Sequence, residues 1–458
     1  MKNEKLIEIS KLRQYFPVKK SSFFDKEQLY VKANDGISIT INKGETFGLV
    51  GESGCGKSTL GRVLLQLYKQ TRGDTVYFGR TVYEYKPKYY EKALNNLSEL
   101  FVHEAKLKEK VDLNDKNHTS ADAYEEQVRH INRICGGLRF CDDKNAVANI
   151  LKDEYAKGCK VAELKEKNAS QSEIENAEKA HDEVLKRIEE MKEPYRSIQD
   201  FYEVDSMWEH GIDLPRLTLE EMRILREDLQ IIFLDPYSSL NPRLTVGQII
   251  SEPLVGQNKF KKGSKELEDY IIEVMKVCGL ESYFIHRYPH QFSGGQRQRI
   301  GIARALALNP KFIVCDEAVS ALDVSIQSQI LNLLQELKEK QNLTYLFISH
   351  DLSVVKYISD RIGVMYLGNM VECAKAEDIF INPLHPYTEA LLNAIPTTDV
   401  NNKELQILEG DIPSPVNPPK GCKFHTRCKY ATEKCKNEAP EWVEIEPEHF
   451  VACHLRSK

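Results

Sequence analysis

The stretch Gly51-Glu-Ser-Gly-Cys-Gly-Lys-Ser-Thr59 decides the fold, because it fits the phosphate-binding pattern G-x-x-x-x-G-K-[ST]. Glycines let the backbone curl so that several N–H groups point at one anion, and a following helix adds the positive end of its dipole. In this pattern Lys57 reaches the β- and γ-phosphates, and the Ser58 hydroxyl is a ligand of Mg²⁺. The predicted nucleotide-binding residues are Gly51, Ser53, Gly54, Cys55, Gly56, Lys57, Ser58 and Thr59.

The flanking residues place this loop between a strand and a helix. Thr46-Phe-Gly-Leu-Val50 is a compact apolar run of the kind that forms a buried strand. Helical spacing separates the apolar residues after the loop, which are Leu60, Val63, Leu64, Leu67 and Tyr68. Strand, glycine-rich loop and helix form the context that the motif requires, which disfavours a chance glycine-rich turn.

Strands and helices resume in the second half of the chain. Three apolar runs, Leu229–Phe233, Phe312–Cys315 and Leu343–Ile348, are typical of buried parallel strands. A helix between the last two carries Ile330, Leu331, Leu333, Leu334 and Leu337. This alternation predicts an α/β layer architecture.

Between about Arg80 and Met222 lysine and glutamate dominate, and glycine is sparse. Spacings of three and four separate Ile174, Ala177, His181, Val184, Ile188 and Met191. We interpret the segment as a helical insertion with a helical hairpin. The alternative for the stripe is one amphipathic helix that packs locally. A long coiled coil is disfavoured, since the pattern does not persist for three or four heptads.

The bulk composition restricts the class of protein. The 458 residues suffice for two or three domains, and 41% hydrophobic residues can form a core. The net charge of −6 disfavours electrostatic binding of nucleic acid. No apolar run approaches the ~20 residues of a membrane helix, and no signal peptide is recognised. We therefore expect a cytosolic protein whose membrane contact is made through a partner.

Two further motifs carry chemistry. Asp316 and Glu317 follow an apolar strand, where Asp316 can hold the Mg²⁺ shell and Glu317 can polarise the attacking water. An acidic pair alone is often only a solvated loop. Ser293-Gly-Gly-Gln296 at a predicted helix start offers a hydroxyl and backbone donors to a second anion.

In their order along the chain these motifs resemble the ATP-binding cassette (ABC) ATPases. The remaining motifs of that order are Cys315-Asp-Glu317, Ser320-Ala-Leu-Asp323 and Ser349-His350. The resemblance implies a RecA-like core with antiparallel β and helical subdomains. It also implies cassettes that pair head to tail, each ATP lying between one phosphate loop and the partner's signature, here Ser293, Gly294, Gly295 and Gln296.

The same resemblance implies roles for single residues. Glu317 and His350 would be catalytic, with His350 on the γ-phosphate. Asp323 would belong to the loop that crosses the dimer interface. Ser58 and Asp316 would bind Mg²⁺. An aromatic before the first strand would stack on adenine; the candidates, left open, are Tyr30 and Phe24.

A narrower resemblance, to the F-type ATPases of oligopeptide/dipeptide (peptide/nickel) importers, rests on four segments: Leu12–Pro17, Asp235–Pro242, Asn382–Thr388 and Gly410–Pro419. It implies a second, unlike ATPase subunit, two membrane permease subunits and an external peptide-binding protein. The chain would lie peripherally on the cytoplasmic face of the membrane and bind no nucleic acid. Oligopeptides, dipeptides and nickel remain open as cargo.

The domain organisation follows from these motifs. Residues 1–79 and 225–385 are predicted to form the nucleotide-binding domain, 80–224 the helical insertion, and 386–458 a C-terminal region with four cysteines. Two alternative functions are a soluble ABC ATPase without transport and a weakly hydrolysing regulatory subunit of the same transporter. The single cassette and acidic charge disfavour the first, and intact Glu317 and His350 disfavour the second.

One position departs from the family. A Gln precedes the Asp-Pro-Tyr motif in these ATPases, where it contacts Mg²⁺ or water, and this chain has Leu234. An isobutyl group cannot do either. Gln230, four residues earlier in the strand, is a poor substitute. We therefore predict that this chain's own site binds nucleotide but turns over slowly.

Four of the eleven cysteines, Cys422, Cys428, Cys435 and Cys453, are spaced C-x5-C-x6-C-x17-C. Thiolates bind soft metals, so Zn²⁺ and an iron–sulfur cluster are both open, as are four unmetallated thiols. Zinc sites usually show C-x₂₋₄-C pairs, and these four cysteines contain none. If the metal is zinc, His425 and His454 are candidate substitute ligands. The resemblance to the dipeptide importers implies a [4Fe-4S] cluster. Cys135, Cys141 and Cys159 repeat two of the spacings and suggest only a weak second metal site.

Overall fold

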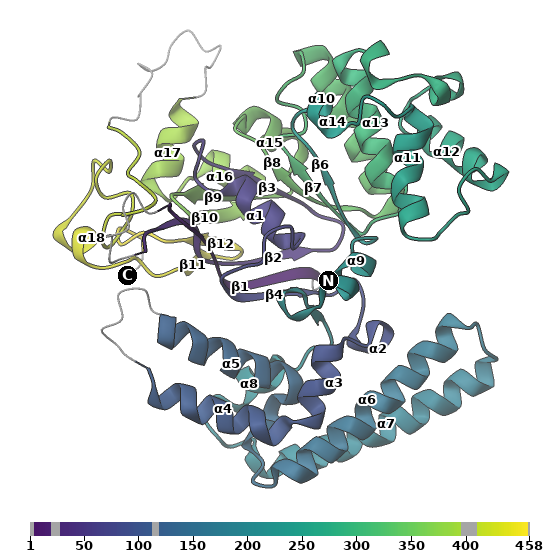
Figure 1. The fold of residues 1–458 in the computed structure, drawn as a ribbon. Helices are drawn as coiled ribbons and strands as arrows, with labels where there is room; N and C mark the ends of the chain where they lie inside the picture. The colour runs from purple at the N-terminus through teal and green to yellow at the C-terminus, as the bar shows by residue number, and fades with distance from the viewer. Residues whose placement is uncertain (1–3, 20–27, 112–118, 395–409, 457–458) are drawn as a thin grey trace. The chain divides into compact units, whose positions relative to one another are not determined.

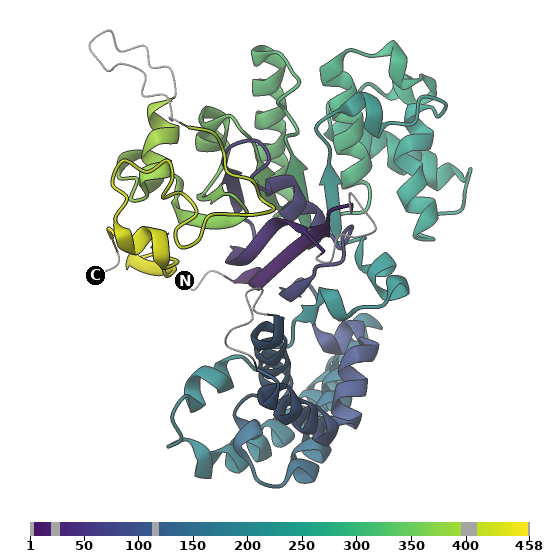
Figure 2. The ribbon, with the colours of Figure 1, turned by 60° about the vertical axis from the view of Figure 1, so that its left-hand side comes forward.

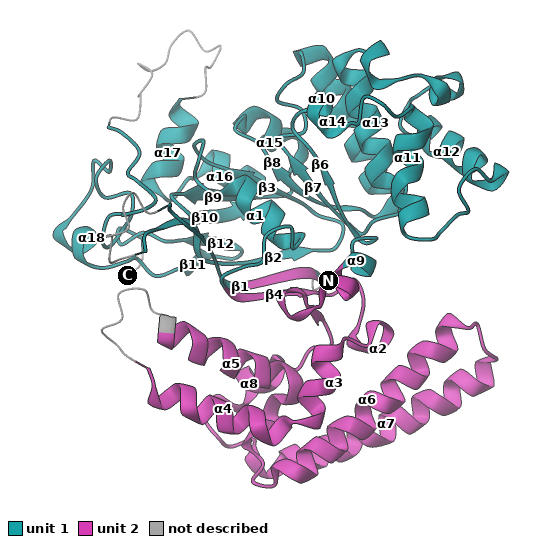
Figure 3. Ribbon diagram, in the orientation of Figure 1, with its two compact units in different colours: residues 1–5, 10–71, 223–458 teal, residues 6–9, 72–222 magenta. Residues whose placement is uncertain are grey.

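The computed structural model describes residues 4–19, 28–111, 119–394 and 410–456. The chain forms two compact units (Figure 3). Unit 1 contains Met1–Lys5, Ser10–Thr71 and Arg223–Lys458, and unit 2 contains Leu6–Ile9 and Arg72–Met222. The start of the predicted insertion, residue 80, therefore falls inside unit 2.

An eight-stranded sheet forms the centre of unit 1 among the described residues (Figure 1). Its strands, in spatial order, are β11 (Val443–Glu446), β12 (His449–Val451), β10 (Asn369–Lys375), β9 (Arg361–Tyr366), β3 (Thr46–Val50), β8 (Thr344–Ile348), β7 (Phe312–Asp316) and β6 (Leu229–Ile232). The strands from β9 to β6 are parallel, and β10, β12 and β11 add antiparallel pairs.

The α/β fold predicted from the apolar runs is confirmed. Every residue of β3, β7 and β8 is buried, as expected for parallel strands covered on both faces. β3 has the predicted bounds, and the other three predicted strands agree to within a residue at each end. Because parallel strands end at one edge, the loops after β3, β7 and β8 share that edge.

Helices cover this sheet and form a separate helical part. Those connecting the core strands are α1 (Lys57–Leu64), α14 (Val324–Gln341) and α15 (Leu352–Ile358). The helical part contains α10 (Pro236–Ser239), α11 (Val246–Gly256), α12 (Lys265–Val277) and α13 (Gly294–Leu306). The remaining elements of unit 1 are β2 (Tyr30–Asn42), α16 (Ala376–Ile381), α17 (Pro386–Asn393) and α18 (Glu433–Asn437), while β1 (Lys5–Pro17) and α9 (Leu219–Leu225) each contribute residues to both units.

The C-terminal segment joins the sheet of unit 1. β12 pairs with β10 through Glu372↔Val451, so the end of the chain extends the sheet on the β10 side. Figure 2 shows the segment in yellow beside α17. Phe424 anchors it, being 2% exposed with its ring centroid 5.2 Å from that of Tyr366 and 5.3 Å from that of Tyr387.

Unit 2 is largely helical and contains its own apolar core. Its elements are β4 (Arg72–Tyr77), α2 (Val82–Tyr85), α3 (Lys88–Asn95), α4 (Leu97–Glu109), α5 (Thr119–Cys135), α6 (Lys144–Glu166), α7 (Gln171–Lys192), α8 (Phe201–Ser206) and β5 (Ile212–Asp213). The predicted helical hairpin is α6 with α7, which pack along each other. The stripe lies on α7, where Val184 and Ile188 are fully buried. No helix in the described part of the chain is both long and apolar enough to span a membrane.

Candidate nucleotide site and the C-terminal cysteine region

The phosphate loop curls at three glycines, as its sequence predicts. Gly51, Gly54 and Gly56 have φ of 146°, 79° and 103°, which side chains rarely adopt. A Cβ on Gly51 would lie 2.2 Å from the carbonyl oxygen of Met365. The loop therefore needs glycine at Gly51 for both conformation and space.

Lys57 occupies the inside of this curl. Its residue is 5% exposed, and Nζ donates to the carbonyl oxygens of Gly51, at 2.7 Å, and Glu52, at 3.0 Å. The lysine begins α1, so the helix N-terminus and the ammonium add positive potential at one place. Such an arrangement suits a polyphosphate.

Asp316 ends β7 and is 4% exposed. Its Oδ2 lies 3.4 Å from Nη2 of Arg62, and its Oδ1 is buried without a hydrogen-bond partner among the described residues. A buried carboxylate oxygen with spare acceptor capacity fits Mg²⁺, which prefers oxygen ligands and keeps several waters. Ser58, half-buried at the start of α1, is the other candidate ligand.

Glu317 and His350 lie together at the same sheet edge. The Glu317 backbone has a φ of 53° and its N–H donates to Ile348 at 3.0 Å. Its Oε2 is 3.2 Å from Nδ1 of His350, whose side chain is 61% exposed. The predicted catalytic pair is therefore one hydrogen-bonded unit that is open to solvent on the histidine side.

The signature segment and Asp323 each cap a helix. Ser293 Oγ accepts from the N–H of Gln296 at 3.4 Å, and the Gln296 side chain accepts from the N–H of Ser293 at 3.1 Å. Asp323 accepts from the N–H of Ile326 at 3.0 Å, which lowers the pKa of its carboxyl. Ser293, Asp323 and the apolar neighbour Val324 are all exposed. They are available to a second molecule.

The position that departs from the family is also exposed. Leu234 has 42% of its surface accessible, just after β6. The Gln230 side chain donates to the carbonyl of Arg226 at 2.5 Å, so it is already engaged away from this position. Of the adenine candidates, Tyr30 is 41% exposed at the start of β2, and Phe24 lies outside the described residues.

The four C-terminal cysteines are free thiols in one neighbourhood. Burial, and to a smaller extent the neighbouring thiols of Cys435, Cys453 and Cys428, raise the pKa of Cys422 to about 11. The Cys422 N–H donates to the carbonyl of Cys435 at 2.8 Å, which joins the segments that carry these two cysteines.

The described residues contain no group of three or more His, Cys, Asp or Glu side chains arranged to hold one metal ion. Tetrahedral Zn²⁺ with Zn–S bonds of about 2.3 Å needs its sulfurs roughly 3.8 Å apart. His425 and His454 are hydrogen-bonded to backbone carbonyls at 2.8 and 2.9 Å. The same finding covers Cys135, Cys141 and Cys159, so neither region supports a zinc site.

One set of contacts to the phosphate loop has no local signal in the sequence. Glu52 forms a two-fold ion pair with Arg427 and its N–H donates to the hydroxyl of Tyr387. Glu52 and Arg427 are 375 positions apart. Opposite charge is the only hint in the sequence, and it does not distinguish this pair from many others.

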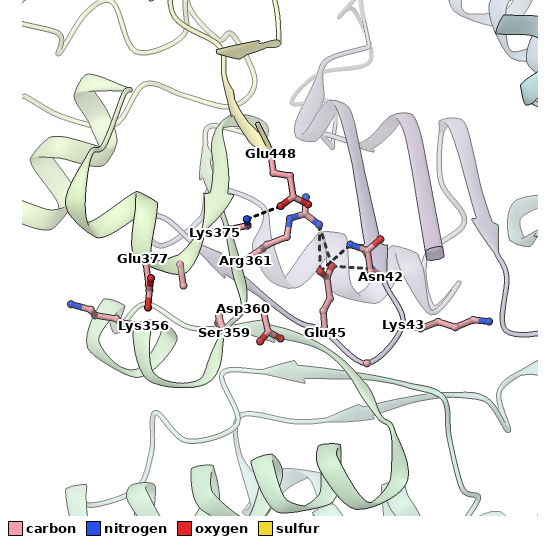
Figure 4. Close-up of a pocket in the computed structure, with 12 residues that line it drawn as sticks. Asn42, Lys43, Glu45, Lys356, Ser359, Asp360, Arg361, Lys375, Glu377 and Glu448 are labelled. Atoms are coloured by element: carbon pink, nitrogen blue, oxygen red, sulfur yellow. Dashed lines mark hydrogen bonds and ion pairs between the residues drawn. The ribbon is translucent and has the colours of Figure 1, made fainter. Parts of the chain in front are cut away.

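A separate cavity of about 670 Å³ shares no residue with the phosphate loop (Figure 4). Two ion pairs join charged residues of its lining. Arg361 lies 3.3 Å from Glu45, and Lys375 lies 3.1 Å from Glu448. This cavity contains none of the predicted site residues.

Comparison with known proteins identifies the family of this chain. The family model for ABC transporters matches residues 34–198 and 196–320, and the model for the oligopeptide/dipeptide transporter C-terminal region matches 371–435. The chain is 38% identical over 457 residues to oligopeptide transport ATP-binding protein AppF of Bacillus subtilis, covering 99% of this chain and 98% of the relative. It is 35% identical over 452 residues to OppF of Salmonella typhimurium, covering 98% and 95%.

Another relative is the dipeptide transport ATP-binding protein DppF of Haemophilus influenzae, 34% identical over 452 residues, or 98% of this chain and 97% of the relative. The solved structure of cbiO1 from Clostridium perfringens covers 83% of this chain and 92% of its own, with 17% identity and a TM-score of 0.45. The chain belongs to the ATP-hydrolysing subunits of the ABC transporter family. Within that family it falls in the oligopeptide/dipeptide branch.

Proposed function

We propose that this chain energises the import of peptides as one ATPase subunit of a membrane transporter. The observation that supports the cargo is the full-length similarity to proteins named for oligopeptide and dipeptide transport, together with the matching C-terminal region at 371–435. Its proposed partners are a second ATPase subunit, two membrane permease subunits and, indirectly, an external peptide-binding protein. It would lie on the cytoplasmic face of the membrane.

In the proposed mechanism the site assembles from two chains. Lys57 and the loop N–H groups would hold the phosphates. Ser58 and Asp316 would hold Mg²⁺, which when bound would supply positive charge against the phosphoryl oxygens. Glu317 orients and polarises the attacking water, while His350, bonded to Glu317 at 3.2 Å, contacts the γ-phosphate. The exposed Ser293 and the half-buried Gln296 complete the partner's site, and Asp323 lies at the dimer interface.

Transport assays test this proposal. The chain, co-expressed with its partner subunits and reconstituted in vesicles, should couple ATP hydrolysis to uptake of labelled peptide. Parallel assays with an oligopeptide, a dipeptide and Ni²⁺ identify the cargo. ATP hydrolysis without association with any membrane subunit would contradict the proposal and favour a soluble ABC ATPase.

Leu234→Gln in the assembled transporter should raise the rate of ATP hydrolysis several-fold. The amide restores a group that can hold Mg²⁺ or water, which the isobutyl group lacks. The measurement is the steady-state rate of phosphate release with the partner ATPase inactivated. Leu234→Met is the matched control, since it keeps an apolar side chain, and should leave the rate unchanged. An unchanged rate in Leu234→Gln would contradict the slow-site hypothesis.

We also propose a [4Fe-4S] cluster on Cys422, Cys428, Cys435 and Cys453. Four neighbouring thiols supply the ligand number, and a cuboidal cluster separates its ligand sulfurs more widely than a single ion does. When bound, the cluster supplies cross-linking of the chain segments that carry the four cysteines.

Protein purified without oxygen should show a broad absorbance near 400 nm and about four iron atoms per chain. A Cys428→Ser variant should lose most of both, while Cys278→Ser, which changes a buried cysteine in α12's C-cap, should retain them. Anaerobic protein without iron would contradict the cluster.

A further inference from the structure

The C-terminal region contacts Glu52, the residue after the first glycine of the phosphate loop, at two points. Arg427 donates from Nη1 to Oε2 of Glu52 at 2.8 Å and from Nη2 to Oε1 at 3.1 Å. Tyr387 accepts from the Glu52 N–H at 2.9 Å. The Arg427 side chain is 4% exposed and Tyr387 is fully buried. Paired, charge-assisted bonds of this kind fix both position and orientation.

The same region also supports the other end of the loop. Lys423 lies 2.8 Å from Asp35 on β2. The neighbouring Asn34 donates to the carbonyl of Gly56 at 3.1 Å. Residues Lys423 and Arg427 thus act on the loop from its two ends, and Phe424 between them is anchored in the core.

Glu52 is connected to the residue that binds phosphate. Its carbonyl accepts from Nζ of Lys57 at 3.0 Å, so a shift of Glu52 moves a partner of the ammonium. Its carboxylate is a negative charge beside a site for a polyanion. Without Arg427 that charge would repel the phosphates of ATP, because the Coulomb energy between two charges a few ångströms apart near a protein surface is substantial.

We propose that Arg427 is a positioning residue for nucleotide binding: it neutralises Glu52 and holds the phosphate loop in its binding shape. The C-terminal region then sets ATP affinity in addition to any role of its cysteines. The inference rests on ATP binding at the phosphate loop and does not depend on the cargo.

A double-mutant cycle on the full-length chain tests this proposal. Binding of Mg²⁺ and a non-hydrolysable ATP analogue is measured by calorimetry for Arg427→Gln, Glu52→Gln and the double variant. We expect Arg427→Gln to weaken affinity roughly tenfold, since it leaves a carboxylate unpaired next to the phosphates. The double variant should recover most of the loss because the charge is gone. Recovery is not expected if Arg427 only supports folding.

Two further variants complete the experiment. Lys429→Gln removes an exposed lysine 3.6 Å from Glu389 in the same region and should bind ATP as the unchanged chain does. Arg427→Lys keeps the charge without the two-fold geometry, so its affinity for the ATP analogue should lie between those of the unchanged chain and Arg427→Gln. It replaces Arg427→Gln in the test if that variant does not fold. Unchanged affinity in Arg427→Gln, or a double variant no better than Arg427→Gln, would overturn the proposal. If the unchanged chain itself binds no ATP, the proposed function fails instead.

Discussion

Glu317→Gln should lower ATP hydrolysis by about 1000-fold in the assembled transporter with the partner ATPase inactivated, while leaving ATP binding intact. Removal of a positioned general base typically costs 10²–10⁴ in rate. The amide keeps the size of the side chain and can still bond His350, so the geometry at 3.2 Å is retained while the basic oxygen is lost. The measurements are phosphate release for the rate and equilibrium titration for binding.

The control is Glu339→Gln, on the exposed part of α14, which should hydrolyse ATP at the normal rate. Both cassettes of the transporter should be tested separately, since the partner's site can mask a loss in this one. Near-normal hydrolysis by Glu317→Gln with the partner inactivated would contradict the role of Glu317. Absence of hydrolysis by the unchanged chain under the same conditions would instead favour the regulatory alternative, a weakly hydrolysing subunit that holds ATP.

Lys57→Ala should weaken ATP binding at least about 100-fold. Hydrogen bonds to charged groups contribute about 1.5–3 kcal/mol each, and this ammonium can reach two phosphates. It is also a buried cation that bonds the carbonyls of Gly51 and Glu52, so its loss loosens the empty loop. Calorimetric titration with Mg²⁺ and a non-hydrolysable analogue measures the change.

Lys69→Ala, which changes an exposed lysine shortly after α1, is the matched control and should bind ATP normally. The melting temperature separates a folding defect from a binding defect. If Lys57→Ala kept the affinity of the unchanged chain, the nucleotide would have to bind somewhere other than the phosphate loop.

Local sequence patterns predicted those structural features that depend on residues close together along the chain. β3, the glycines of the loop and α1 follow each other directly, so their spacing carries the whole signal. The stripe on α7 was equally informative, because a helix in a hairpin buries one face, and Val184 and Ile188 lie on that face. Strand ends were less certain, since the last residue of a strand depends on its neighbours.

Contacts between distant segments could not be predicted in the same way. The Glu52–Arg427 pair requires the C-terminal region to return to the loop after β10 and α17, which no local pattern encodes. Within unit 2, the buried Asp74 is bonded by Arg129 at 2.5 Å, and both lie in ordinary-looking charged segments. The site roles, the domain limits at 80 and 224 and the cluster remain predictions for the experiments above.

Two strands of unit 2, β4 at the start of its segment 72–222 and β5 near the end of that segment, are hydrogen-bonded to each other. β4 and β5 are antiparallel, with Val76 opposite Asp213 and Tyr77 opposite Ile212. The helices between β4 and β5 therefore begin and end at two neighbouring strands of one antiparallel pair. A two-residue turn could connect Tyr77 directly to Ile212 in place of these helices. The helices between β4 and β5 can therefore be gained or lost in one insertion or deletion that leaves the pairing of these two strands intact.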